Sequence, residues 1–473
     1  MILQRSSFYI AGDLAPKVIA FFTIPILTRI LKSDEYGIIV YVNALLSIIS
    51  PIFSFGSATY MFKAINLNVG SYYRTIKIIH TLFWSLIAGT LSLSLLLYLA
   101  FKFIPFTTHF QLGDYALYIV SIAFFSSISN IPLNCLRVYG KAKNYFSFNL
   151  FSTILENILI IILITQMRQG MQGWFIGKLI TSLLYAGVIC ITFRKILFKK
   201  YFNKTYAYEG FLFGIPFTMG SLLFVLNNIS DRFILERYIT LKELGLYGLA
   251  YSIAFVIQAI NSGIAKAVQP NIIHHAKNHT GKELQLIFTD YQQLINTITF
   301  TSVICFLIAN KYIFDFIISP TYRESFNYVI FLSIAPIFLS IFNIYSSFLV
   351  ARGKKMYYVY SAAFGLLANL VINILLIPEI KVFGAIIATI ISYFIILIVG
   401  YYKCKQIAKF VLFDKSFYIL SSLLLVTMIL LFFNFFDSIM LEILSIITII
   451  STITTYIFKT KTYERLGILL QKI

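Results

Sequence analysis

Long apolar stretches separated by short polar breaks run through almost the whole chain. Each stretch covers about 20 residues, which is the length that an α-helix needs to cross a hydrocarbon core of roughly 30 Å. Transmembrane β-strands would show alternating apolar and polar positions over about ten residues, and residues 444–453 do not alternate in this way. The pattern therefore predicts an all-α integral membrane protein.

We expect about fourteen transmembrane helices from this pattern. Their predicted bounds are 8–30, 37–62, 78–101, 115–136, 147–166, 172–193, 210–230, 245–265, 293–310, 328–350, 357–378, 382–402, 417–435 and 439–458. The longest connection, 270–292, contains an amphipathic stretch at 283–291 that we expect to lie as a helix along the membrane surface.

Composition agrees with a lipid environment. Of the 473 residues, 59% are hydrophobic and 12% are charged, and the mean hydropathy is +0.86, whereas about a quarter of the residues of soluble proteins are charged. The formal net charge of +20 would favour a nucleic-acid partner in a soluble chain. Here most Lys and Arg residues lie in loops beside apolar stretches, where they fix membrane orientation, so no nucleic-acid role follows.

The distribution of Lys and Arg predicts how the chain is oriented. Most of these residues lie on the side that holds the N-terminus, for example in 194–204 and 403–415, and this asymmetry places both termini in the cytoplasm. The connections on the opposite side are short. A membrane-embedded polymerase or ligase of glycans needs a longer external segment to hold its acceptor, so we favour transport and expect no enzymatic activity.

The two halves of the chain share a set of motif positions at a nearly constant separation. The matched pairs are Gly12 and Gly220, Arg29 and Arg237, Glu35 and Glu243, Gly37 and Gly245, Gly140 and Gly353, Lys141 and Lys354, and Gly173 and Gly384. Because six predicted helices separate the copies, both copies have the same orientation, and an axis along the membrane normal would relate them.

The repeat predicts three parts. Residues 1–203 form an N-terminal six-helix bundle, residues 204–409 form a second six-helix bundle, and residues 410–473 add a two-helix hairpin with a cytoplasmic tail. We expect the two bundles to face one another across a central cavity.

Three motifs carry a family resemblance. They are PILTRILKSDEYG at 25–37, NISDRFILERY at 228–238 and RGKK at 352–355. Over about residues 8–403 the chain resembles the Wzx-type polysaccharide flippases, which translocate O-antigen and capsule units. The resemblance implies a MATE-like fold of the MOP superfamily, alternating access, and an undecaprenyl-diphosphate-linked oligosaccharide as cargo in the bacterial cytoplasmic membrane. The additional helix pair is more like the lipid II flippases than the twelve-helix drug exporters.

Ionisable side chains inside the predicted spans are costly, so each needs a partner or a function. Asp13 and Lys17 stand one turn apart on the first helix, where they form either a structural pair or a cavity-facing one. Glu156 has no basic partner one turn away on its own helix, and it is either a proton acceptor or a hydrogen-bonded structural acid. We therefore predict Asp13 and Glu156 as ion-coupling residues.

Cations near the cavity would take over the counter-charge of a diphosphate. We predict this role for five residues: Lys17, Arg29, Lys178, Arg232 and Arg237. Two of them have a simpler alternative, because Lys178 could snorkel to the interface and Arg232 could form an interfacial pair with Asp231.

No cofactor or metal is expected. The histidines of 274–279 have no acidic or thiol companion beside them. The four cysteines lie within or beside apolar stretches without close pairing, which predicts buried apolar side chains rather than a disulfide framework. These four residues are Cys135, Cys190, Cys305 and Cys404.

Two other functions remain open. A MATE-type antiporter of small cationic drugs would use the same fold with a lumen richer in acids, and a glycan polymerase or ligase is the second alternative. For the flippase, the expected partners are the lipid-linked oligosaccharide, membrane lipid, a proton or sodium ion, and other polysaccharide-assembly proteins.

Overall fold

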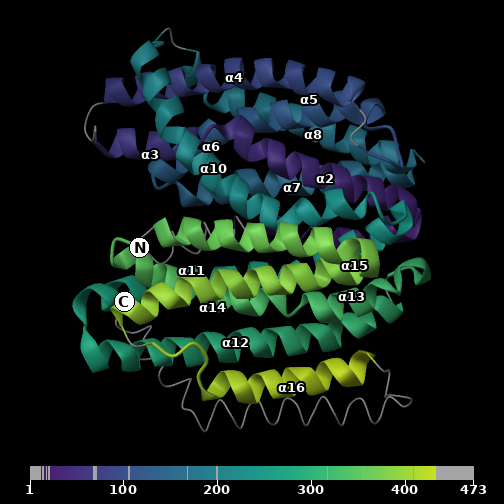
Figure 1. Cartoon of the computed structure of the whole chain (residues 1–473). Coiled ribbons are helices and arrows are strands. Elements are labelled where there is room, and N and C mark those ends of the chain that lie inside the picture. Colours follow the sequence, from purple (N-terminus) through teal and green to yellow (C-terminus); the bar gives the residue numbers. More distant parts are fainter. Residues whose placement is uncertain are drawn as a thin grey trace. The chain divides into compact units, whose positions relative to one another are not determined.

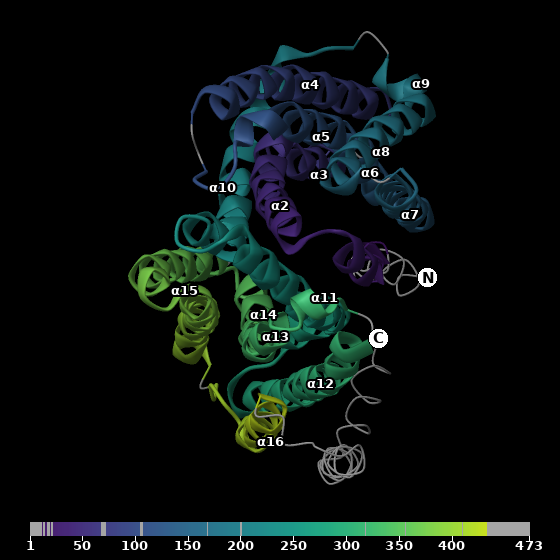
Figure 2. The ribbon, with the colours of Figure 1, turned by 90° about the vertical axis from the view of Figure 1, so that its right-hand side faces the viewer.

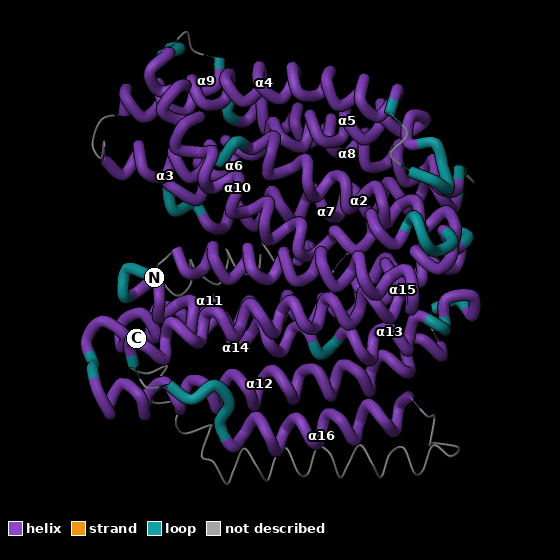
Figure 3. Tube along the Cα trace, in the orientation of Figure 1, coloured by secondary structure: helices purple, strands orange, loops and turns teal. Residues whose placement is uncertain are grey.

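The computed structural model is helical throughout the part of the chain that it describes, and no strand occurs there (Figures 1 and 3). The described residues are 12, 15–16, 19, 22–67, 72–104, 107–167, 169–198, 201–316, 318–354, 356–408 and 410–432. The predicted all-α fold class is thereby confirmed for these residues. The predicted helix 439–458 and ten of the 23 residues of the predicted first helix, 8–30, lie outside them.

The chain divides into two compact units, Met1–Gly245 and Leu246–Ile473. The first contains α2 (Ser33–Ser54), α3 (Ser57–Leu67), α4 (Tyr72–Phe103), α5 (Ala116–Ile128), α6 (Asn130–Val138), α7 (Ala142–Thr165), α8 (Gly170–Thr192), α9 (Arg194–Leu197), α10 (Lys204–Leu235) and the first turn of α11 (Leu241–Asn278). Within this unit α2 packs against α5 and α10, and α5 packs against α8 (Figure 2).

The second unit continues along α11, and its described part contains five further α-helices. They are α12 (Gly281–Phe316), α13 (Ser325–Leu332), α14 (Ala335–Ala351), α15 (Met356–Ile407) and α16 (Lys415–Phe432). Here α14 packs against α15, and α12 packs against α14 and α16. The expected division at 203/204 stays a prediction, since α10 is grouped with the first unit through its packing against α2, α3 and α4.

Ten helices of the described chain are long and apolar enough to cross a membrane. One of them, α15, has non-helical backbone angles at Ile380 and Lys381, so it contains both predicted spans, 357–378 and 382–402. The predicted surface helix at 283–291 is wrong. These residues are the first turns of α12, which continues without a break to Phe316.

Two of the predicted spans, the fourth and the tenth, are each interrupted shortly before a proline. A proline ring clashes with the carbonyl of the residue four positions earlier and its nitrogen donates no hydrogen bond. In agreement, α5 ends at Ile128, four residues before Pro132, and α13 ends at Leu332, four residues before Pro336. The fourth and tenth predicted spans are therefore interrupted in the same way and for the same reason.

The matched motif residues have equivalent structural roles. After α6, the Lys141 amide donates to the Leu136 carbonyl at 2.8 Å across Gly140, which has a φ of +66°. After α14, the Lys354 amide donates to Leu349 at 2.8 Å across Gly353, with a φ of +73°. Both are helix ends of the Schellman type, for which a left-handed glycine is needed. The repeated Gly-Lys pair thus encodes a helix stop.

The matched glycines Gly37 and Gly245 meet one another in the first unit. An added Cβ on Gly37 would lie 2.1 Å from the Leu241 carbonyl oxygen, and one on Gly245 would lie 2.4 Å from that of Ser33. Each glycine therefore lies close to the backbone four residues before the other. The preceding Glu35 and Glu243 also have the same role, because their carboxylates accept the amides of Lys32 and Thr240 at the two helix starts.

Cysteine burial follows the expectation only in part. Cys135 and Cys404 are buried and Cys190 is half-buried, but Cys305 is exposed on α12. The prediction is wrong for Cys305, because an apolar sequence window does not distinguish a lipid-facing position from one that packs against protein.

Asp414 connects the start of α16 to α12 through hydrogen bonds. Its carboxylate is buried and accepts hydrogen bonds from Asn296 Nδ2 at 2.7 Å and Ser416 Oγ at 2.6 Å, and from the amides of Ser416 and Phe417. The additional helix is therefore held by a polar clamp as well as by apolar packing.

We expect Asp414→Ala to lower the free energy of unfolding by about 2–3 kcal/mol, because buried donors lose a charged acceptor. Thermal unfolding of the purified protein in detergent measures this effect. The matched control is Asp114→Ala, which removes an exposed acid from another helix start. Equal unfolding midpoints for the two variants would show that the clamp contributes no stability.

Candidate substrate cavity

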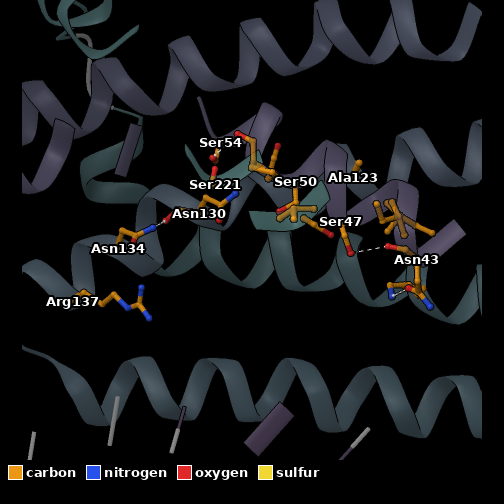
Figure 4. Close-up of a pocket in the computed structure, with 16 residues that line it drawn as sticks. Asn43, Ser47, Ser50, Ser54, Ala123, Asn130, Asn134, Arg137 and Ser221 are labelled. Atoms are coloured by element: carbon orange, nitrogen blue, oxygen red, sulfur yellow. Dashed lines mark hydrogen bonds between the residues drawn. The ribbon is translucent and has the colours of Figure 1, made fainter. Parts of the chain in front are cut away.

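A cavity of about 740 Å³ lies inside the first unit (Figure 4). Five helices supply its wall: α2, α5, α6, α8 and α10. The lining residues are Asn43, Leu46, Ser47, Ser50, Pro51, Ser54, Ile122, Ala123, Ser126, Ser127, Asn130, Asn134, Arg137, Lys178, Ser221 and Val225. Nine of these sixteen residues are Ser or Asn, so the wall carries many hydroxyl and amide groups in an otherwise strongly apolar chain.

Helical spacing explains how α2 presents its polar face. Asn43, Ser47, Ser50 and Ser54 follow one another at intervals of three or four residues, so they lie on one side of the helix. The hydroxyl of Ser47 donates to the Asn43 carbonyl at 2.8 Å, which satisfies it locally while its oxygen can still accept a further bond.

The second polar row lies on α6. Asn130, Asn134 and Arg137 have the same spacing, and all three line the cavity. The Asn134 side-chain nitrogen donates to the Asn130 carbonyl at 2.8 Å. Arg137 is half-buried, and its guanidinium lies 4.4 Å from the centre of the Tyr145 ring, an arrangement that holds the cation in place.

The two cations of the lining lie in different parts of the cavity. Figure 4 shows Arg137 at one end and Asn43 at the other, and Asn43 is the hydrogen-bond partner of Lys178. Lys178 Nζ lies 3.0 Å from Asn43 Oδ1, 3.5 Å from Glu156 Oε1 and 4.8 Å from the centre of the Trp174 ring. Lys178 is therefore paired inside the protein and does not snorkel alone to an interface.

Among the predicted site residues that the structure describes, Lys178 and Glu156 lie in contact with one another. Glu156, on α7, has its basic partner on the neighbouring α8, where a search along a single helix could not find it. Arg29 and Arg237 are exposed, and neither is part of the described lining of this cavity. Asp13 and Lys17 lie outside the described residues.

Arg232 lies at a different place, in a buried polar cluster at the end of α10. Its Nη1 atom donates to the Asn228 carbonyl at 2.6 Å and to Asp231 Oδ1 at 3.2 Å. The neighbouring Glu236 is also buried, and its carboxylate accepts the amides of Thr108 and His109 at 2.7 and 2.9 Å. Much of the 228–238 motif thus stabilises a helix end and the loop that follows α4.

The sequence reading missed the polar rows on α2 and α6. Their signal was present as Ser and Asn residues at helical spacing within apolar spans, but small polar side chains at such spacing also serve helix packing. Only the structure shows that these two rows face the same space. No group of three or more His, Cys, Asp or Glu side chains suited to a metal ion occurs among the described residues.

Ten membrane-length helices among the described residues define a multi-pass membrane protein, and its first unit encloses a polar cavity. The sequence pattern of the family described as "Polysaccharide biosynthesis protein" matches residues 26–327. The chain therefore belongs to that family, which confirms the resemblance drawn from its motifs.

Solved structures confirm the MATE-like fold. The lipid II flippase MurJ, in an inward closed conformation, has a TM-score of 0.76 at 17% identity, over 97% of this chain and 99% of that one. A multidrug resistance MATE family transporter in an inward-facing conformation has a TM-score of 0.67 at 14% identity, over 85% of this chain and 94% of that one. At these identities the likeness concerns the fold alone.

Curated relatives occur in Haemophilus influenzae. A protein of its Lsg locus is 23% identical over 286 residues, which are 57% of this chain and 65% of that protein. A second membrane protein of the same strain is 24% identical over 298 residues, with coverage of 59% and 67%. The chain thus spans about two thirds of the length of these relatives.

Proposed function

We propose that the chain is a flippase that carries an undecaprenyl-diphosphate-linked oligosaccharide across the bacterial cytoplasmic membrane by alternating access, with both termini in the cytoplasm. The observation that carries this proposal is the cavity in the first unit. Its wall offers hydroxyls, amides and two cations, which are the groups that a glycan head with a diphosphate requires.

Each part of the cargo has a matching surface. Sugar hydroxyls both donate and accept hydrogen bonds, as do the Ser and Asn side chains of the wall. A diphosphate loses its water on entry, and this loss is tolerable only where cations and donors replace the water. The polyprenyl tail needs no cavity, because it stays in the lipid. A volume of about 740 Å³ lies within the usual range for binding sites.

The drug antiporter is disfavoured by the same wall. A site for flat organic cations uses aromatic faces and acids. The described lining contains neither an aromatic residue nor an Asp or Glu, although 17% of the chain is aromatic. The glycan polymerase or ligase is less well supported, because the solved structures that share this fold include a lipid II flippase and a MATE family transporter.

A flipping assay tests the proposal. Purified protein in proteoliposomes should move a fluorescent polyprenyl-diphosphate-linked oligosaccharide between leaflets. Arg137→Gln should slow this movement about tenfold or more, because a cation of the wall is lost. The control, Arg194→Gln, removes an exposed cation outside the cavity and should move cargo at the normal rate. Export of a cationic dye without any lipid movement would refute the flippase.

A further inference from the structure

Lys178 is held between three elements of the first unit, and this arrangement goes beyond a simple cationic wall. Asn43 comes from α2, Glu156 from α7, and Trp174 from one turn earlier on α8. The Lys178 and Glu156 side chains are 22% and 35% exposed. Both can therefore rearrange, and both remain partly shielded from water.

The two polar contacts of Lys178 differ in length. The ammonium lies at full hydrogen-bond distance from the neutral Asn43 amide, at 3.0 Å, but only at ion-pair distance from the Glu156 carboxylate, at 3.5 Å. An ammonium has three N–H donors. The shorter polar contact of Lys178 is thus made to a residue of the cavity wall, while the carboxylate compensates its charge from a slightly greater distance.

Glu156 contacts Lys178 and is not part of the described cavity lining. Its carboxylate lowers the cost of keeping a lysine inside the membrane while the site is empty. An anion that enters the cavity has to compete with Glu156 for the same ammonium. A singly charged group gains little from this exchange, because it replaces one carboxylate by an equivalent charge. A diphosphate brings more charge and more acceptor oxygens, so it gains more.

We propose that Lys178 exchanges Glu156 for the diphosphate of the cargo, with Asn43 as the positioning residue that keeps the ammonium turned toward the cavity. This inference rests on the proposed function and adds a selection rule to it. Glu156 makes the site reject monoanions, and its return to Lys178 helps to expel the diphosphate on the far side. The same residue thus sets both the specificity and the release.

Two probes test the exchange on the full chain in lipid nanodiscs: geranyl diphosphate and geranyl monophosphate. Glu156→Gln should tighten monophosphate binding by about three- to fivefold, the strength of a partly exposed ion pair, so that the preference for diphosphate falls. Lys178→Met should remove the preference altogether. Asn43→Ala should weaken the binding of both probes. The control Glu324→Gln, at an exposed acid, should leave both affinities unchanged.

The flipping assay gives the second readout. Glu156→Gln should release cargo more slowly, so the flipping rate should fall while binding becomes tighter. If Glu156→Gln weakened both probes equally, or left their ratio as in the wild type, the carboxylate would only be structural and the exchange would be overturned. The binding ratio is measured without transport. A wild type that shows the ratio but moves no lipid would therefore refute the flippase function and leave the exchange supported.

Discussion

Replacing Gly37 by Ala is expected to destabilise the protein, although the same substitution inside a helix normally stabilises by up to about 1 kcal/mol. The added methyl carbon would lie 2.1 Å from the Leu241 carbonyl oxygen, and the atom in the way is backbone, which has no rotamer to yield. We expect a loss of about 3 kcal/mol or more, since α2 and α11 must move apart. Gly245→Ala should have the same effect through Ser33.

Gly187→Ala is the matched control for this prediction. Gly187 lies inside α8, where an added Cβ meets nothing within 4 Å, so this variant should be as stable as the wild type or more so. Thermal unfolding of the purified protein in detergent compares the three variants. The decisive feature is the sign of the change. An increase in the unfolding midpoint for Gly37→Ala would show that the close approach of the two helices is not a requirement of the fold.

The glycine contact shows what the sequence could and could not provide. Gly37 and Gly245 were recognised as equivalent because they align in the two halves. Sequence equivalence gives no information on distance, however. Only the structure shows that Gly37 lies against the backbone at Leu241 and Gly245 against the backbone at Ser33. The Gly-Lys pairs at 140 and 353 are a similar case, because their alignment was visible and their role as helix stops needed the backbone angles.

The sequence could indicate site residues only where an ionisable side chain lies inside an apolar span, because such a charge is costly in the membrane. Lys178 and Glu156 stood out as ionisable groups within apolar spans, and the structure places them 3.5 Å apart. Ser50 and Asn130 carry no such cost, so they resemble packing residues until the cavity between the helices is seen. Arg232 differs from these residues, because its charge at a helix end is satisfied locally by Asp231 and the Asn228 carbonyl. Its role toward the cargo stays a prediction.

The character of the cavity wall has a consequence for transport. Small hydroxyls and amides offer many weak hydrogen bonds of similar strength, and the described lining presents no aromatic face on which a sugar ring could stack. A cargo on such a wall can shift from one set of partners to the next without leaving a deep minimum. This property suits a carrier that has to release what it binds.

Filling the cavity should therefore block transport without unfolding the protein. We expect Ser50→Trp to reduce the flipping of the lipid-linked oligosaccharide by more than about tenfold, because the indole occupies space that the glycan needs. Ser50 is exposed to the cavity, so the larger side chain does not have to enter a packed core. The unfolding midpoint should stay close to that of the wild type, and Ser50→Thr should flip cargo normally.

Ser92→Trp provides the positional control, since Ser92 is exposed on α4 and is not among the described residues that line the cavity. A graded form of the experiment uses Ser50→Cys in a background without the native cysteines. Thiol reagents of increasing size should then slow flipping in proportion to their volume. If even the largest reagent reacted fully and flipping continued, the cargo would follow another route through the protein. In that case the cavity between α2 and α6 would have to be given up as the transport path.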